Sequence, residues 1–102
     1  MGEITNYSIT NGTAIVKIPV SVDENIDNVE KKLNKLFTSL RSKYYLFVSD
    51  PVMIGIDAFE DTRVILRVSA ETIPGEGFSG ARIIRKEVQK CFYKKVLRHH
   101  NQ

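Results

Sequence analysis

Two consecutive stretches of alternating apolar side chains constrain the fold of this chain most. They run from Val52 to Phe59 and from Arg63 to Glu71, and the acidic turn Glu60-Asp61-Thr62 separates them. Such alternation is typical of strands with one buried face, so the pair predicts a β-hairpin. The predicted buried faces carry Val52, Ile54, Ile56 and Ala58 on the first strand and Val64, Leu66, Val68 and Ala70 on the second. A hairpin alone is not stable in water, so other elements must cover this face.

The size and composition of the chain fit one small domain. With 102 residues, of which 42% are hydrophobic, it has enough apolar material for a single core. Its apolar runs are too short to cross a bilayer, and no charged and then apolar leader opens the sequence, so we expect no export signal. The one cysteine, Cys91, excludes an internal disulfide. Its helical position predicts a small buried hydrophobic residue rather than a nucleophile.

Three more elements are expected around the hairpin. A strand is predicted over Thr13–Ser21 after the turn signal Asn11-Gly12, with Pro19 near its end or on a sheet edge. A helix is predicted from a cap at Asp23 or Asn25 to Lys43. Its apolar face carries Ile26, Val29, Leu33, Leu36, Phe37 and Leu40. A second helix is predicted from about Ser79 to Arg98, and its apolar face carries Ala81, Ile84, Val88, Cys91, Phe92 and Val96.

This order of elements predicts an α+β fold of the ferredoxin-like, split β-α-β type. The sheet is expected to be antiparallel or mixed, with both helices on one face and the closing strand missing or truncated. The right-handed crossover rule leads us to expect Thr13–Ser21 parallel to Arg63–Glu71. Thr13–Ser21 would then be an open edge that can pair with another copy. Residues 1–12 are interpreted as the end of a preceding β-domain or a linker, 13–98 as the domain, and 99–102 as a disordered tail.

Basic residues concentrate in the second predicted helix. Between Arg82 and Arg98 there are seven lysines and arginines and one acid, Glu87, in a chain whose net charge is +3. Such a helix attracts phosphates or an anionic surface, or it is simply the solvated back of an amphipathic helix. The second interpretation is favoured, because no aromatic side chain stands among these bases at a spacing suited to stacking on nucleotides.

The sequence contains no pattern typical of an enzyme, a metal site or a cofactor site. Asp57 is the one candidate general acid or base, and a lone carboxylate is weak support for catalysis. His99 and His100 are adjacent near the end of the chain, which is a poor arrangement for metal ligands. The segment Gly75–Gly80 precedes a helix but lacks the Lys-Ser/Thr ending of a phosphate-binding loop. We therefore predict neither catalytic residues nor metal- or cofactor-binding residues.

RNA recognition by the open sheet face is also disfavoured. That use of the fold needs paired aromatic side chains on which bases stack. The alternate strand positions instead carry Met53, Gly55, Ile65, Arg67 and Ser69, and Phe59 is the one aromatic residue nearby. We therefore expect no nucleic-acid partner.

Taken together, several stretches resemble the cytoplasmic C-terminal region of the small-conductance mechanosensitive channel (MscS) family. The first is the string Gly2, Ile4, Asn6 and Ser8, followed by the strand Thr13–Ser21 and the acidic-capped helix start Asp23–Val29. Next come Asp50-Pro51 opening a strand, the turn acids Glu60-Asp61, and the strand base Arg67. The last are the loop Ile73-Pro74-Gly75 and the basic helix segment Arg82–Glu87. The pore helices and the closing strand of the family have no counterpart in these residues.

The resemblance implies a parent protein in the cell membrane, a homo-heptameric channel that opens under bilayer tension. It would release ions and small solutes during hypo-osmotic stress. This domain would lie on the cytoplasmic side, in a cage that filters solutes, and it would not be an enzyme. We expect the charge met by ions there to come from Lys31, Lys32 and Lys35, or from Arg85, Lys86 and Lys90.

Two alternatives to a channel domain remain at this point. The first is a free-standing ferredoxin-like regulatory or ligand-binding module that oligomerises through the Thr13–Ser21 edge. The second is a small enzyme whose site is completed by a partner chain. The presence of apolar helices encoded upstream of this chain would distinguish the channel domain from both alternatives.

Overall fold

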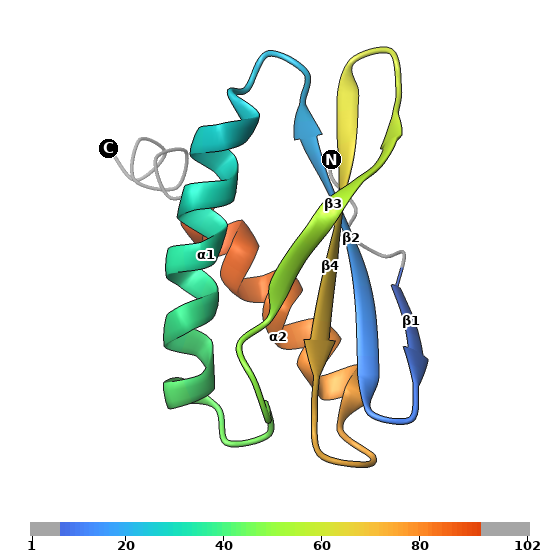
Figure 1. Ribbon diagram of the computed structural model, residues 1–102, viewed down its shortest axis with the longest axis vertical. Coiled ribbons are helices and arrows are strands. Elements are labelled where there is room, and N and C mark those ends of the chain that lie inside the picture. Colours follow the sequence, from blue (N-terminus) through green and yellow to red (C-terminus); the bar gives the residue numbers. More distant parts are fainter. Residues whose placement is uncertain (1–6, 93–102) are drawn as a thin grey trace, which may run out of the picture.

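A computed structural model describes residues 7–92 of the chain (Figure 1). The elements are β1 (Tyr7–Thr10), β2 (Thr13–Ser21), α1 (Ile26–Lys43), β3 (Val52–Phe59), β4 (Arg63–Glu71) and α2 (Gly77–Phe92). Three strands have the bounds predicted from the sequence. Helix α2 begins two residues before the predicted Ser79, while its predicted end at Arg98 and the predicted tail 99–102 lie outside the described residues.

The four strands form one open antiparallel sheet in the order β1-β2-β4-β3. Both helices pack on the same face of this sheet, with α2 behind β2 and β4 in the view of Figure 1. This arrangement confirms the predicted α+β fold and is compatible with a ferredoxin-like split β-α-β unit.

The expected parallel pairing of Thr13–Ser21 with Arg63–Glu71 is wrong. Strand β2 pairs antiparallel with β4 along its whole length, from Thr13 opposite Glu71 to Ser21 opposite Arg63. The crossover through α1 makes β3 run parallel to β2, and the tight turn after β3 then reverses the chain. Strand β4 therefore inserts antiparallel between them, which is what splits the β-α-β unit.

The expectation that Thr13–Ser21 is an open edge is also wrong for its first half. Asn11 (φ 48°) and Gly12 (φ 85°) both take left-handed backbone angles, as a two-residue hairpin turn requires. The turn folds β1 back onto β2, with Tyr7 opposite Val16 and Thr10 opposite Thr13. Within residues 7–92, the second half of β2 has no strand partner on that side. The division of the chain at residue 12 stays a prediction.

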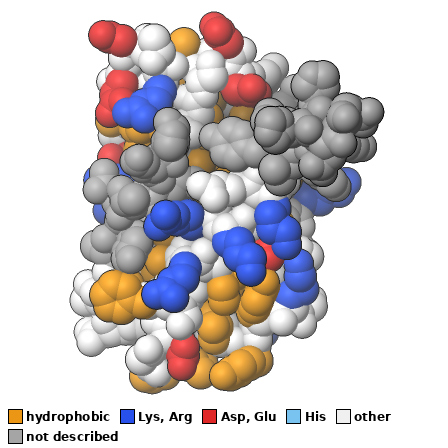
Figure 2. Space-filling view, turned by 180° about the vertical axis from the view of Figure 1, so that it is seen from behind, with side chains coloured by type: hydrophobic (Ala, Val, Ile, Leu, Met, Phe, Trp, Pro, Cys, Tyr) orange, Lys and Arg blue, Asp and Glu red, His pale blue; other side chains and the backbone are white. Residues whose placement is uncertain are grey.

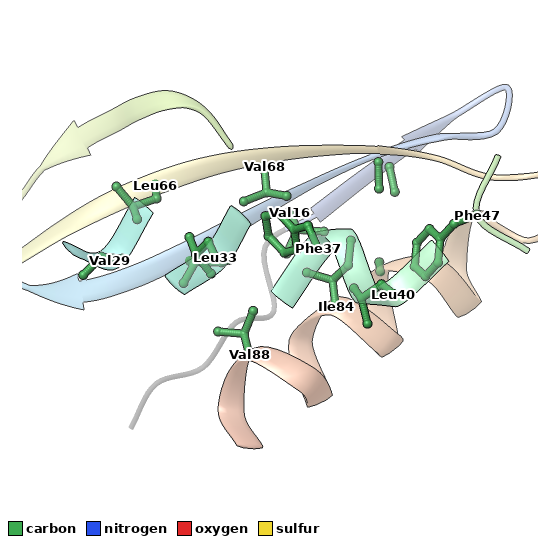
Figure 3. Packing of buried hydrophobic residues seen from close by; sticks show 14 of the residues in the cluster. Val16, Val29, Leu33, Phe37, Leu40, Phe47, Leu66, Val68, Ile84 and Val88 are labelled. Carbon is green, nitrogen blue, oxygen red and sulfur yellow. The ribbon is translucent and has the colours of Figure 1, made fainter. Parts of the chain in front are cut away.

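The core lies between the sheet and the two helices (Figure 3). Asn25 caps α1, and its side chain accepts a hydrogen bond from the backbone N–H of Asn28 at 3.2 Å. Of the two predicted caps, Asp23 and Asn25, the structure confirms Asn25. Figure 3 shows Phe37 and Ile84 facing the sheet from the two helices. The buried hydrophobic residues from the helices are Val29, Leu33, Phe37, Leu40, Ala81, Ile84 and Val88. Val64, Leu66, Val68 and Ala70 are buried from β4, as predicted.

Two predictions of burial are wrong. Val52, Ile54 and Ile56 of β3 are 52%, 54% and 43% exposed, because β3 is an edge strand whose pairing with β4 shifts register twice. Before the first shift, Val52 pairs with Ser69 and lies on the face away from the core, while Met53 pairs with Val68 and packs against the core. The shifts then change the face that later residues take. Cys91 is exposed because it stands beyond Val88, the last buried residue of α2.

Candidate subunit-contact and charged surfaces

Strand β3 carries exposed apolar side chains at the edge of the sheet. They are Val52, Ile54, Ile56 and Phe59, and we call them the edge patch. The register with β4 places Val52 on the face of Ser69, and Ile56 and Phe59 on the face of Leu66 and Val64, so the patch wraps around the edge. Phe59 is 73% exposed, which is a large apolar surface for one residue to leave in water. Contiguous exposed apolar side chains mark surfaces that contact another protein or another copy.

The backbone of β3 does not suit simple addition of another strand. Its register with β4 shifts between Met53 and Gly55 and again between Ile56 and Ala58. Gly55 has φ 153°, a conformation that other residues rarely adopt. Such irregularities twist an edge and interrupt its row of free N–H and C=O groups, so they oppose strand pairing. Contacts through the edge patch are therefore expected between side chains rather than between backbones.

An ion cluster crosses three strands on the sheet face opposite the helices. Asp57 of β3 accepts a hydrogen bond from Arg67 of β4 at 2.9 Å, and its other oxygen lies 3.4 Å from the ammonium of Lys17 on β2. The hydrogen bond from Arg67 is the main cause that lowers the pKa of Asp57, and Lys17 adds to it against the opposite effect of desolvation. The carboxylate is thus ionised and fully engaged, which favours a role in fixing the strands over proton transfer.

A second carboxylate joins the two helices. Glu87 of α2 is 4% exposed, and one carboxylate oxygen accepts a hydrogen bond from the Tyr44 hydroxyl at 2.8 Å. The other oxygen lies 3.5 Å from the ammonium of Lys43. The ammonium of Lys90 lies 3.9 Å from the oxygen that Tyr44 binds. We call Lys43, Tyr44 and Glu87 the helix clamp, because it fixes the end of α1 to the middle of α2.

The helix clamp explains how a buried carboxylate stays charged. Desolvation alone raises the pKa of Glu87, but the Tyr44 hydrogen bond and the two lysines outweigh it and hold that pKa below its ordinary value. The same hydrogen bond, with burial, raises the pKa of Tyr44. The sequence analysis counted Glu87 as the one acid in a basic helix and did not predict this contact. Its position three residues after a buried isoleucine, at the edge of the apolar face of α2, is the signal that places it near the core.

The other residues singled out from the sequence are dispersed. Lys31, Lys32 and Lys35 are exposed on α1, and the ammonium of Lys32 lies 5.6 Å from the centre of the Phe92 ring. His99 and His100 lie outside the described residues. Within residues 7–92, no group of three or more His, Cys, Asp or Glu side chains is placed to hold a metal ion.

The loop Gly75–Gly80 is integrated into the fold and is not free to wrap around a phosphate. Gly77 begins α2 directly, and a side chain at Gly80 would meet the Thr72 methyl at 2.7 Å. Ile9, Gly12, Pro74 and Phe78 line a hollow of about 510 Å³ beside this loop. Apolar groups and backbone form most of this surface, which offers little to an anion.

None of the helices in the described part of the chain is both long enough and apolar enough to span a membrane.

Comparison with known proteins identifies one relevant similarity. No family model matches the sequence. A small-conductance mechanosensitive channel from Caldanaerobacter subterraneus subsp. tengcongensis is 26% identical to the chain over 94 residues. The aligned part covers 92% of this chain and 33% of that channel, so the chain spans about a third of the length of this relative. The match confirms the predicted resemblance to small-conductance mechanosensitive channels, and the α+β fold is compatible with it.

Proposed function

We propose that this chain is a cytoplasmic part of a mechanosensitive channel in the cell membrane, one that releases ions and small solutes on hypo-osmotic stress. The observation that carries the proposal is the similarity to such a channel along 92% of the chain. The membrane-spanning part of the parent protein would then lie outside the residues described here. The domain itself would act through assembly and surface charge, without catalysis.

The edge patch supports the assembly part of this proposal. A cage below a pore is built from copies of one chain, a heptamer if the resemblance extends to subunit number, and each copy then needs surfaces for its neighbours. The exposed Val52, Ile54, Ile56 and Phe59 offer one such surface on a single edge of the sheet. Burial of apolar side chains between copies is a main driving force of such assembly.

The filtering part of the proposal rests on charge. Lys31, Lys32 and Lys35 are exposed and follow one another at helical spacing on α1. In a cage wall, bases on a face toward the solution would raise the local concentration of anions and lower that of cations. We therefore assign these three lysines to the solvent-facing side of the assembled domain.

The experiment that tests the proposal uses the whole natural protein that contains this chain. It is expressed in cells that lack their own mechanosensitive channels, and survival after sudden dilution is measured together with currents in membrane patches under suction. The proposal predicts rescued survival and tension-gated current. Survival no better than that of cells without the protein, together with patches that show no current, would refute it if the protein is present in the membrane.

Matched variants then test assembly and ion preference separately. Ile54→Lys places a charge in the edge patch and should reduce the yield of assembled channel, whereas Val48→Lys, at a 45% exposed apolar position outside β3, should not. Replacing Lys31, Lys32 and Lys35 with glutamate should shift ion preference toward cations while currents persist. Unchanged preference would contradict the assignment of these lysines.

A further inference from the structure

A row of basic side chains runs along the outward side of α2. Arg82, Lys86 and Lys90 stand at intervals of four residues on the exposed side of the helix, and the half-exposed Arg85 flanks them. We call these four residues the basic row. Like charges four residues apart repel one another on a helix, so the row is locally unfavourable. A locally unfavourable pattern on an otherwise regular helix indicates that something outside the helix uses it.

The basic row is largely without acidic partners inside the molecule. Arg82, Arg85 and Lys86 form no ion pair with any residue in the described range 7–92. Lys90 reaches the buried Glu87 at 3.9 Å, and its side chain remains 60% exposed. In Figure 2, basic side chains gather across the middle of the face seen from behind, while acidic ones lie mostly near the upper end.

The acidic side chains gather where two loops meet. The backbone N–H of Val22 donates to the carbonyl of Thr62 at 3.0 Å, which holds the β2–α1 loop against the β3–β4 turn. This contact brings five exposed acids to one end of the molecule, Asp23, Glu24, Asp27, Glu60 and Asp61, which we call the acidic end. Apart from Glu60, which binds Arg63, these acids form no ion pair with another described residue.

The acidic end also carries the apolar surface that a protein contact needs. Val22 is 50% exposed and Phe59 is 73% exposed, and both stand among the acids. Stable protein contacts combine an apolar centre with a polar or charged rim. Phe59 is also the last residue of the edge patch, so the two surfaces share this side chain.

We propose that the acidic end of one copy docks on the basic row of the next copy. This contact depends on the proposed function only because it requires a homo-oligomer. It identifies the surfaces through which the copies meet. The two surfaces are unlike, so each copy contributes one of each, and repetition of the contact builds a head-to-tail assembly, which is a ring when the rotation between neighbours closes. Complementary charge gives such a contact its register and speeds encounter, and the apolar side chains exclude water from its centre.

A second copy accounts for the observations better than an anionic membrane does. A membrane surface would explain the basic row but would leave the acidic end and its exposed Val22 and Phe59 without a role. The contact between copies uses both surfaces and neutralises both. It also leaves Lys31, Lys32 and Lys35 of α1 free to face the solution.

Charge reversal on each surface tests the contact in the 102-residue chain. One variant carries Arg82→Glu and Lys86→Glu on the basic row, and another carries Glu24→Lys and Asp61→Lys on the acidic end. Association is measured by sedimentation velocity at low ionic strength. Each variant alone should associate more weakly than the parent by roughly fivefold for each reversed charge, whereas an equimolar mixture of the two should recover association.

The control variant carries Lys31→Glu and Lys35→Glu, which change net charge by the same amount as the basic-row variant and should leave association unchanged. Circular dichroism establishes that all variants fold. A chain carrying both reversals, on basic row and acidic end together, should associate like the parent, because its two surfaces are again complementary. Rising salt should weaken the association of the parent.

Three results would overturn the contact. They are a parent chain that stays monomeric at low ionic strength, unchanged association of both single-surface variants, and absence of recovery on mixing. Binding of the parent to anionic vesicles, lost with Arg82→Glu and Lys86→Glu while association is unchanged, would assign the basic row to a membrane surface instead. None of these results decides the proposed function, which is tested separately by tension-gated current in the whole protein.

Discussion

Replacing Tyr44 with phenylalanine removes one hydroxyl from the helix clamp and leaves the ring in place. The hydroxyl donates to Glu87 at 2.8 Å, and the ammonium of Lys90 lies 3.9 Å from the same carboxylate oxygen, beyond hydrogen-bonding distance. The edge-to-face contact of the Tyr44 ring with Phe47, at 6.4 Å between centres, needs no hydroxyl and should persist. The substitution therefore isolates a single hydrogen bond to a buried carboxylate.

The size of the effect follows from the charge and burial of Glu87. A hydrogen bond to an ionised group contributes about 1.5–3 kcal/mol, and Glu87 is only 4% exposed, so water cannot readily replace the lost donor. We expect a loss of about 2 kcal/mol in the free energy of unfolding at neutral pH. For a domain of this size, such a loss lowers the melting temperature by roughly 10 °C.

The effect should depend on pH in a defined direction. The pKa of Glu87 is lowered in the folded state, so its contribution to stability is present above the ordinary glutamate pKa of about 4.3 and is lost as pH falls through the folded-state pKa. In Tyr44→Phe, desolvation is less opposed and the pKa of Glu87 rises. The stability difference between parent and variant should therefore be constant near neutrality and shrink on acidification.

Urea unfolding monitored by circular dichroism at several pH values measures both effects. Tyr45→Phe is the matched control, because Tyr45 is the next residue and is 81% exposed; its unfolding free energy should change by less than about 0.5 kcal/mol. Equal stability of Tyr44→Phe and the parent at neutral pH would refute the reasoning. A loss that stays the same at acidic pH would also refute it, since the charge of Glu87 would then play no part.

Two further predictions concern the turn before β2 and the ion cluster on the sheet. In urea unfolding, Gly12→Ala should lower the free energy of unfolding by more than Gly75→Ala. Both positions have left-handed φ, which costs a residue with a side chain about 1–3 kcal/mol. A side chain at Gly12 would also meet the Thr72 carbonyl oxygen at 2.8 Å, whereas one at Gly75 would meet nothing within 4 Å. Equal losses would contradict this. The carboxyl of Asp57 should titrate by NMR below an ordinary aspartate and move upward in Arg67→Gln; an unchanged titration would show that the 2.9 Å hydrogen bond is not formed in solution.

The fold was predictable because each of its elements is determined by residues that are close together in the sequence. The alternation in Thr13–Ser21 and Arg63–Glu71, the cap at Asn25 and the Asn11-Gly12 turn each follow from neighbouring residues, and the structure confirms them. The element order then restricts the topology to few possibilities. The pairing direction of β2 and β4 was mispredicted because the parallel relation belongs to β2 and β3, which β4 separates.

Burial at the sheet edge and the helix clamp could not be predicted from local pattern. Ile54 and Ile56 alternate like core residues, and only the position of β3 at an edge and its two register shifts leave them exposed. Glu87 meets Tyr44 across 43 residues of sequence, so no periodicity reveals the contact. Absence of metal or catalytic sites was also predicted, and this stays a prediction for the chain as a whole.

The measurement that tests the central claim most directly is an immunoblot of fractionated cells with an antibody against this domain. If the chain is the cytoplasmic part of a membrane channel, the antibody should detect a protein much larger than 11.6 kDa in the membrane fraction. Alkaline carbonate, which strips peripheral proteins, should leave it there. A soluble protein near 11.6 kDa, absent from the membrane fraction, would contradict the account and favour a free-standing module.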